Sequence, residues 1–165
     1  MSDLKAIILK NAPILQARMP WANAAWLLGA LAEVESTFGT NNVPRYEKAY
    51  DEGGIYYRRS PEVRARHVRW GDWAHCSYSS FQVMFHTACE LGFRGTPLDL
   101  WKDEVAIFWV IEFIRKRAIE KGAKTLSEIF DAYNSGTHRD RIVPEEYIAK
   151  GLGNYQTVGV RRGLG

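Results

Sequence analysis

The segment LLGALAEVESTFG, residues 27–39, has the pattern of an apolar helix that carries two glutamates two positions apart. Successive helical residues are rotated by about 100° around the axis. At this spacing the apolar side chains form one stripe, and Glu35 falls within it, between Leu28 and Leu31. Glu33 points to nearly the opposite side. We therefore predict that Glu35 is partly buried and that Glu33 faces solvent.

The surroundings predicted for Glu35 bear on its chemistry. An ionised carboxylate among leucines is costly, so burial raises its pKa and allows it to hold a proton near neutral pH. Cleavage of a glycosidic bond needs such an acid, because the leaving oxygen is protonated as the bond breaks. An arginine nearby would instead lower the pKa. The helix alone favours the alternative that Glu35 forms a structural ion pair at the end of the helix.

The whole chain of 165 residues, 46% of them hydrophobic, predicts a single, mainly α-helical domain over residues 1–165. Apolar residues recur at helical rather than alternating spacing. Residues 40–60 break this periodicity and predict a long loop, and residues 152–165 predict a mobile basic tail. The expected helices are one from a cap at Ser2 to Lys10, a short turn from Pro13, helices over 20–38, 61–69, 80–91, 103–121 and 125–134, and a short one from Pro144.

Composition narrows the possible partners. The chain has 22 Lys and Arg and 19 Asp and Glu, and its net charge of +3 favours an anionic polymer or surface. The best apolar run, VAIFWVI at 105–111, is far shorter than the ~20 residues of a membrane span, so no stable membrane insertion is expected. Residues 21–32 resemble a signal-peptide cleavage region, but cleavage there would remove most of the helix that carries Glu35. We expect no signal peptide.

Cysteine and histidine spacing predicts neither a disulfide framework nor a metal site. Cys76 and Cys89 are too few for such a framework and are expected to be free thiols. The four histidines, His67, His75, His86 and His138, lack paired ligand spacing.

Four short motifs follow one another over residues 25–150: ESTF at 35–38, SYSSFQVM at 77–84, AYNSG at 132–136 and the tyrosine of EEYIAKG at 145–151. Their order resembles the lysozyme-like superfamily, specifically goose-type lysozymes and lytic transglycosylases, and within it the phage-type endolysins, which also share RYE at 45–47. The resemblance implies a lysozyme-like fold and cleavage of the β-1,4 bond between N-acetylmuramic acid and N-acetylglucosamine in peptidoglycan, without a cofactor.

The resemblance makes Glu35 the general acid and base, and it assigns contacts to sugar or to Glu35 to five further residues: Ser36, Gln82, Tyr133, Asn134 and Tyr147. Each has a structural alternative, because a serine can bond to helix backbone, an asparagine can cap a helix, and buried tyrosines need partners in any case. Ser79 and Ser80 stand where the family has glycine and leucine. From the residues alone, one of these serines caps a helix with Phe81 and Met84 in the core.

The loop at 40–60 supplies candidate second carboxylates, Glu47 and Asp51. If one of them faces Glu35 across the sugar at about 6.5–9.5 Å, the pair can hydrolyse the bond with inversion. Without such a partner, the substrate's own hydroxyl closes on the anomeric carbon and leaves a 1,6-anhydro end, as in lytic transglycosylases. The alternative for Glu47 is an ion pair with a neighbouring arginine.

Aromatic residues concentrate beside the expected cleft. Their flat faces suit sugar rings, whereas the alternative is a small core under the long loop. The candidates are Tyr56, Tyr57, Trp70, Trp73 and Tyr78, of which Tyr78 is the one assigned to substrate binding.

The expected protein is a monomeric endolysin that is made in the host bacterial cytoplasm and reaches the wall through a membrane lesion. One rival is a non-catalytic glycan-binding phage module, which the presence of Glu35 disfavours. Another is a nucleic-acid binder, suggested by RRSPEVRARHVRW at 58–70. A solvated basic face is the commoner explanation, so no nucleic acid is expected.

Overall fold

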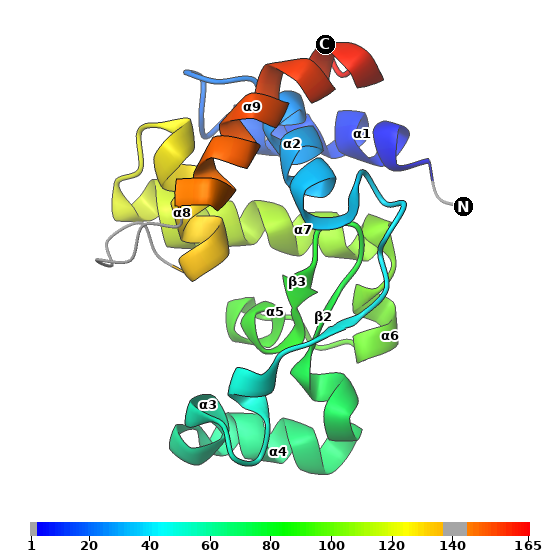
Figure 1. The fold of residues 1–165 in the computed structure, drawn as a ribbon, viewed down its shortest axis with the longest axis vertical. Coiled ribbons are helices and arrows are strands. Elements are labelled where there is room, and N and C mark those ends of the chain that lie inside the picture. Colours follow the sequence, from blue (N-terminus) through cyan, green and yellow to red (C-terminus); the bar gives the residue numbers. More distant parts are fainter. Residues whose placement is uncertain (1–2, 137–144) are drawn as a thin grey trace.

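The computed structural model describes residues 3–136 and 145–165, and this part of the chain is mainly helical, as predicted. Figure 1 shows an upper lobe and a lower lobe, with α7 running across the base of the upper lobe. The upper lobe contains α1 (Leu4–Gln16), α2 (Ala24–Ser36), α7 (Asp103–Phe113), α8 (Leu126–Ser135) and α9 (Glu145–Arg162). The lower lobe contains α3 (Ile55–Arg59), α4 (Pro61–Trp70), α5 (Phe85–Leu91) and α6 (Pro97–Leu100).

Helix α1 differs from its prediction at both ends. Asp3 caps it by accepting a hydrogen bond from the Ala6 N–H (3.1 Å), whereas Ser2 lies outside the described residues. The helix continues through Pro13, so the predicted break before this residue is wrong. Proline leaves the carbonyl four residues earlier without its donor. That residue is Leu9, which is 40% exposed.

Helix α2 begins later than expected, because Asn23 rather than the Pro20 region starts it by accepting from the Trp26 N–H (3.1 Å). It ends at Ser36, where Thr37 and Phe38 adopt left-handed φ values of 53° and 54°. The Phe38 N–H closes the end on the Ala32 carbonyl (3.0 Å). The chain therefore turns away just after Glu35.

Helix α9 extends to Arg162, so the predictions of a short last helix and of a mobile tail over 152–165 are wrong. Pro144, the predicted start, lies outside the described residues. Two glycines allow α9 to pack closely: a Cβ at Gly151 would lie 2.5 Å from the Phe130 ring, and one at Gly159 would lie 2.4 Å from the Trp26 ring. Leu164 is buried beyond the helix end. This close packing overrides the low helix propensity of glycine.

A small antiparallel sheet connects the lobes. Its order is β1 (Arg45–Tyr46), β2 (Cys76–Tyr78) and β3 (Val83–Met84), with Arg45 opposite Ser77 and Ser77 opposite Met84. The predicted loop at 40–60 contains β1, a 3₁₀ turn η1 (Lys48–Tyr50) and α3. A second 3₁₀ turn, η2 (Gly71–His75), leads into β2.

The predicted helix over 80–91 begins only at Phe85. The residues before it form a turn between β2 and β3, because Ser79 and Gln82 take left-handed φ values of 71° and 48°. A serine cap on this helix is therefore wrong. Helix α4 matches its prediction over 61–69, and 103–121 is helical, with a π-helical turn at Ile114–Ala118 and a 3₁₀ turn at Ile119–Lys121.

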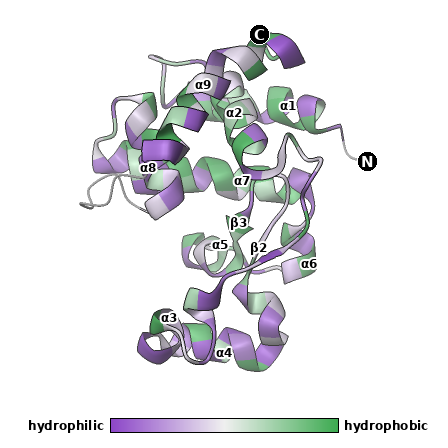
Figure 2. Cartoon of the chain, in the orientation of Figure 1, coloured by the Kyte–Doolittle hydropathy of each residue, from purple (hydrophilic) through white to green (hydrophobic). Residues whose placement is uncertain are grey.

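Helix α2 lies at the centre of the upper lobe, packed against both α1 and α9. Figure 2 shows hydrophobic residues on α1, α2 and α7, and many hydrophilic residues on α3 and α4. Leu27, Leu28 and Leu31 of α2 are fully buried. Within the described residues, no helix combines the length and the apolar character that crossing a membrane requires.

Candidate functional site

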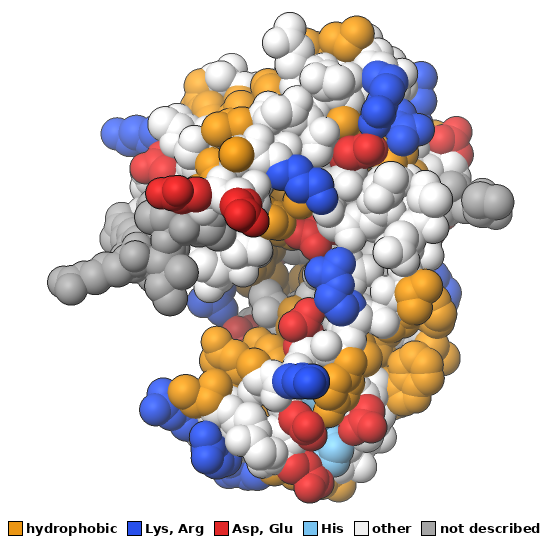
Figure 3. Space-filling view, viewed as in Figure 1, with side chains coloured by type: hydrophobic (Ala, Val, Ile, Leu, Met, Phe, Trp, Pro, Cys, Tyr) orange, Lys and Arg blue, Asp and Glu red, His pale blue; other side chains and the backbone are white. Residues whose placement is uncertain are grey.

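A pocket of about 500 Å³ opens between the lobes, and Figure 3 shows the molecule hollowed there. The upper wall comes from the end of α2, from α7 and from the end of α8, whereas the lower wall comes from the sheet, η1 and α3. A pocket of this size suits part of a polymer or a small molecule. Of the residues assigned a role from sequence, those lining it are Glu35, Glu47, Gln82, Tyr133 and Asn134.

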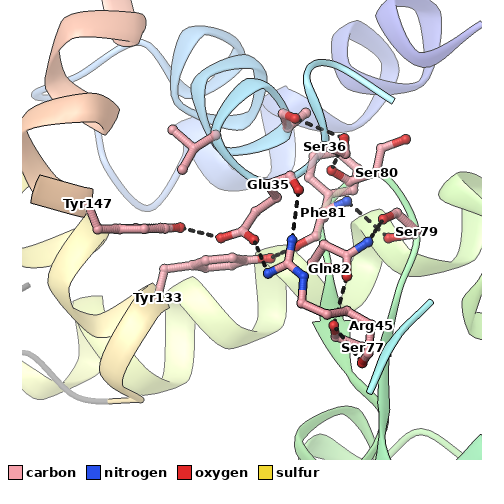
Figure 4. Close-up of polar contacts among 12 residues, drawn as sticks. Glu35, Ser36, Arg45, Ser77, Ser79, Ser80, Phe81, Gln82, Tyr133 and Tyr147 are labelled. Atoms are coloured by element: carbon pink, nitrogen blue, oxygen red, sulfur yellow. Dashed lines mark hydrogen bonds and ion pairs between the residues drawn. The ribbon is translucent and has the colours of Figure 1, made fainter. Parts of the chain in front are cut away.

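Glu35 lies at the upper wall of the pocket, where α2 ends, and its side chain is 12% exposed. Figure 4 shows it between Tyr147 and Arg45. The Tyr147 hydroxyl donates to Oε1 (2.6 Å), and the Arg45 guanidinium lies 3.7 Å from Oε2 and donates to the Glu35 carbonyl (3.1 Å). The prediction of a partly buried Glu35 with a tyrosine hydroxyl beside it is confirmed.

Burial is the main influence on Glu35 and raises its pKa above the ordinary 4.5. The hydrogen bond from Tyr147 and the positive charges of Arg45 and Lys150 each lower the pKa, and the charge of Glu47 raises it further. The pKa of Glu35 is raised overall, so the effect of burial is larger than that of Arg45, whose position beside Glu35 the sequence did not indicate. Burial and the charge of Glu35 also raise the pKa of Tyr147, which keeps this hydroxyl a donor at neutral pH.

Glu33 does not face solvent, which corrects the prediction. Its side chain is 14% exposed and pairs with Arg161 (2.8 Å) and Arg162 (3.4 Å) of α9. The periodicity of α2 gave the correct side for Glu33, but the length of α9, which covers that side, was not foreseen. Glu33 is therefore a structural contact between two helices.

The floor of the pocket is the turn between β2 and β3. The Gln82 amide donates to the carbonyls of Val43 (3.2 Å) and Ser79 (3.1 Å), and its oxygen accepts from the Ser77 hydroxyl (2.8 Å). Asp103 at the start of α7 accepts from the Ser80 N–H and hydroxyl, both at 2.8 Å. Gln82 thus lines the pocket, as expected, but its polar atoms are already bonded within the protein.

Ser36 and Tyr78 lie away from the pocket lining, and the hydroxyl of each is bonded to backbone, as in the structural alternative. The Ser36 hydroxyl is buried against the carbonyls of Ala32 (3.0 Å) and Ser80 (2.7 Å). Tyr78 is fully buried, and its hydroxyl donates to the Trp73 carbonyl. In both cases the polar atom meets backbone instead of solvent.

Tyr133 and Asn134 lie where α8 meets the pocket. The Tyr133 hydroxyl donates to the Phe81 carbonyl (2.8 Å), so it ties α8 to the floor. Burial and the nearby charge of Glu35 raise its pKa well above the ordinary value. Asn134 is exposed at the pocket edge. Of this pair, Asn134 is the residue whose amide is open to a ligand.

The two candidate second carboxylates occupy different places. Glu47 lines the pocket, and among the described residues it forms no ion pair within 4 Å. Asp51 lies outside the pocket lining, accepts from the Glu52 N–H (2.8 Å) and hydrogen-bonds to the Tyr46 side chain. The structure therefore brings Glu47, and not Asp51, to the site of Glu35.

Of the aromatic candidates, Tyr56 lines the pocket, together with Tyr50, which sequence reasoning missed. The two rings stack at 4.6 Å with an interplanar angle of 24°. Trp70 borders a second hollow beside α5, and Trp73 is 52% exposed outside the pocket. Tyr57 packs edge to face on His67 (5.5 Å). The clustering of tyrosines in the loop was the only sequence signal for this wall.

Cys76 and Cys89 are free thiols in the structure. Within residues 3–136 and 145–165, no group of three or more His, Cys, Asp or Glu side chains is arranged to hold a metal ion. His67, His75 and His86 nevertheless contact one another, which their spacing in the sequence did not indicate. His138 lies outside the described residues.

Comparison of the chain with protein-family models, with curated protein sequences and with solved structures finds no match in any of the three. A function therefore rests on the chemistry of the pocket and on the order of the motifs.

The hydrogen bond from Tyr147 yields a prediction about pH. Replacing Tyr147 with Phe removes a donor that favours the ionised form of Glu35, so the pKa of Glu35 should rise further. If the acid form is the active one, activity falls as pH climbs through this pKa, and the basic limb of kcat/KM should move to higher pH. The profile is measured on soluble glycan chains.

Tyr155→Phe is the matched control, because this α9 tyrosine accepts from the Asn23 N–H (2.6 Å) away from the pocket. It should leave the position of the limb unchanged. A basic limb that stays in place or moves down in Tyr147→Phe would show that Tyr147 does not tune the acid.

Proposed function

We propose that this chain is a peptidoglycan-cleaving endolysin with a lysozyme-like fold, which cuts the β-1,4 bond between N-acetylmuramic acid and N-acetylglucosamine with Glu35 as general acid. The observation that carries the proposal is a partly buried glutamate, hydrogen-bonded to Tyr147, at the wall of an open pocket between two lobes, where burial raises its pKa. The order of four motifs, with Glu35 in the first, supports the same function. The proposed enzyme acts as a monomer on the wall and without a cofactor.

The contacts of Glu35 identify the atom that would deliver the proton. Oε1 already accepts from Tyr147, so the proton of the neutral acid belongs on Oε2. Arg45, 3.7 Å from Oε2, can stabilise the carboxylate that remains after the proton has left. The arrangement therefore supports a cycle in which Glu35 gives up a proton to the leaving oxygen and is stabilised as an anion.

The product of the reaction depends on Glu47, the other carboxylate among the described lining residues. If Glu47 activates water, Glu47→Gln should lose about 10²- to 10⁴-fold in rate, as expected for loss of a general base. Asp51→Asn, which alters a carboxylate of the same loop outside the pocket, is the matched control and should stay near wild type. We expect this hydrolytic outcome. Glu47→Gln with nearly full activity, together with anhydro products, would contradict it and mark a lytic transglycosylase.

Mass spectrometry of digested peptidoglycan tests the function directly. Purified walls incubated with the chain should release disaccharide muropeptides with N-acetylmuramic acid at the new ends. A reducing end and a 1,6-anhydro end differ in mass by one water, so the same spectrum separates the two reactions. If walls of several bacterial types release no muropeptides, a non-catalytic glycan-binding module becomes the better explanation.

A further inference from the structure

Three histidines of the lower lobe form a continuous chain of ring contacts. His86 Nε2 lies 3.4 Å from His75 Nδ1, and His75 Nε2 lies 2.7 Å from His67 Nδ1. The chain has a charged partner at each end: Arg66 lies 3.2 Å from His86 Nδ1, and Glu52 lies 3.4 Å from His67 Nε2. His75 and His86 are fully buried.

The end partners set the direction of the chain. An arginine can only donate, so His86 Nδ1 must accept and its proton must sit on Nε2. His86 then donates to His75 Nδ1, and His75 donates from Nε2 to His67 Nδ1. His67 is left with its proton on Nε2, facing the carboxylate of Glu52. All contacts are satisfied when all three rings are neutral and carry the proton on Nε2.

This chain also reaches the pocket. His86 stacks on Tyr50 at 4.6 Å with an interplanar angle of 14°, and Tyr50 stacks on Tyr56. Both tyrosines line the pocket. Tyr57 and Tyr46 pack against His75, each at 6.2 Å. The pocket wall is thus the outer end of an aromatic stack whose inner end is the histidine chain.

We propose that the chain His86–His75–His67, when all three rings are neutral and carry their protons on Nε2, holds the Tyr50–Tyr56 wall in position for a sugar ring. Protonation of the chain loosens this wall and weakens glycan binding. The glycan part of this proposal rests on the proposed function. Flat tyrosine faces suit the apolar face of a sugar, and a fixed pair binds with less loss of side-chain freedom than a mobile one.

A single added proton is enough to disturb the chain. A proton on His67 Nδ1 turns that atom into a donor. The facing Nε2 of His75 must then accept, so His75 must carry its own proton on Nδ1. Two N–H groups of His75 and His86 then face each other.

The charged groups facing the chain from the elements packed around it are Arg66 from α4, Asp72 from η2 and the loop carboxylates Asp51 and Glu52, while Glu90 and Glu47 act on Tyr50.

The electrostatics agree with neutral rings at His75 and His86. Burial, followed by the neighbouring His67, lowers the pKa of His75, and burial, followed by Arg66, lowers the pKa of His86 to about 3. A base with a lowered pKa binds fewer protons when folded than when unfolded. Its stabilising contribution is therefore complete above the unfolded value of about 6.5 and is lost as pH falls below that value toward the folded one.

The first experiment reads the ring protons by long-range ¹H–¹⁵N NMR on the full chain at pH 7.5. We expect His67, His75 and His86 all to be neutral with the proton on Nε2. Any of these rings found mainly with the proton on Nδ1 would overturn the proposal. This measurement does not depend on any enzyme activity.

The second experiment uses His75→Phe, which keeps an aromatic ring at this position and removes both hydrogen bonds. We expect the Tyr50 and Tyr56 resonances to shift, and the glycan dissociation constant, measured in the Glu35→Gln background, to rise by about two- to tenfold. The wild-type chain should show the same changes on acidification through the lowered pKa of His75. Trp73→Phe, an exposed aromatic change in the same turn η2, is the matched control and should leave both readings unchanged.

The outcomes separate this proposal from the proposed function. Unshifted tyrosine resonances in His75→Phe would overturn the positioning role, whatever the activity. Resonances that shift as expected in a chain that binds no glycan at any pH would support the positioning role and would contradict the glycan function of the pocket. A glycan affinity that stays constant from pH 7.5 to pH 4 would overturn the pH-dependent part.

Discussion

Glu35→Gln is expected to abolish release of muropeptides from purified walls, with a loss of at least about 10²-fold in rate. The substitution keeps the shape of the side chain and an oxygen that can accept from Tyr147, but it removes the transferable proton. Dye release from labelled peptidoglycan measures the rate, and circular dichroism checks that the fold is retained. A variant with more than half of the wild-type rate would contradict the assignment of the acid.

Glu104→Gln is the control for this variant, because Glu104 is exposed on α7 and lies outside the pocket lining. Glu33→Gln is not suitable, since Glu33 pairs with two arginines of α9.

The pH dependence of folding stability provides a second test of the raised pKa of Glu35. Glu35 has a raised pKa, so the folded state binds more protons than the unfolded state and wild type loses stability as pH rises above about 4.5. The Gln variant should lack this part of the pH dependence.

Asp103→Ala should destabilise the protein by about 3–5 kcal/mol, because two hydrogen bonds to a carboxylate are lost, each worth roughly 1.5–3 kcal/mol. The change leaves the buried Ser80 N–H without its acceptor. It also releases the turn that holds Gln82 at the pocket floor, so the rate should fall under conditions in which the chain is still folded. Urea denaturation and dye release measure the two effects.

Asp99→Ala is the matched control for Asp103→Ala. Asp99 completes the capping box of α6 with a side chain that is 41% exposed, so its loss should cost only about 1 kcal/mol and should not alter the rate. Equal destabilisation by the two alanine variants would show that Asp103 is not the support of the turn.

The burial of Glu35 was predictable from sequence because α2 is a regular helix whose apolar stripe holds through its last turn. The length of α9 was not predictable, since Gly151 and Gly159 disfavour a helix on propensity alone. Only the facing rings of Phe130 and Trp26 make glycine the suitable residue there. A sequence pattern shows where small residues stand, but not which aromatic ring will approach them.

The lower wall of the pocket was harder to predict for a different reason. The sequence predicts a helix cap at Ser79 or Ser80, whereas Ser79 takes a left-handed conformation that glycine adopts at lower cost. Asp103, 23 positions further along the chain, holds the resulting turn at Ser80. Tyr50 and Arg45 lie in a segment without periodicity, so nothing local indicates that they face Glu35 or the pocket.

The contact between Tyr147 and Glu35 joins residues 112 positions apart. Closing a loop of this length has an entropic cost, so we expect this contact to form late in folding. Until α9 docks, α2 exposes apolar surface that a collapsed intermediate would present to other chains. Refolding should therefore show a species with most of its helix content in which Trp26 does not yet pack against Tyr155 and Gly159, as the indole ¹H–¹⁵N resonance of Trp26 would report. In such a species the carboxyl group of Glu35 would still be hydrated, so its pKa should rise only in the last step of folding.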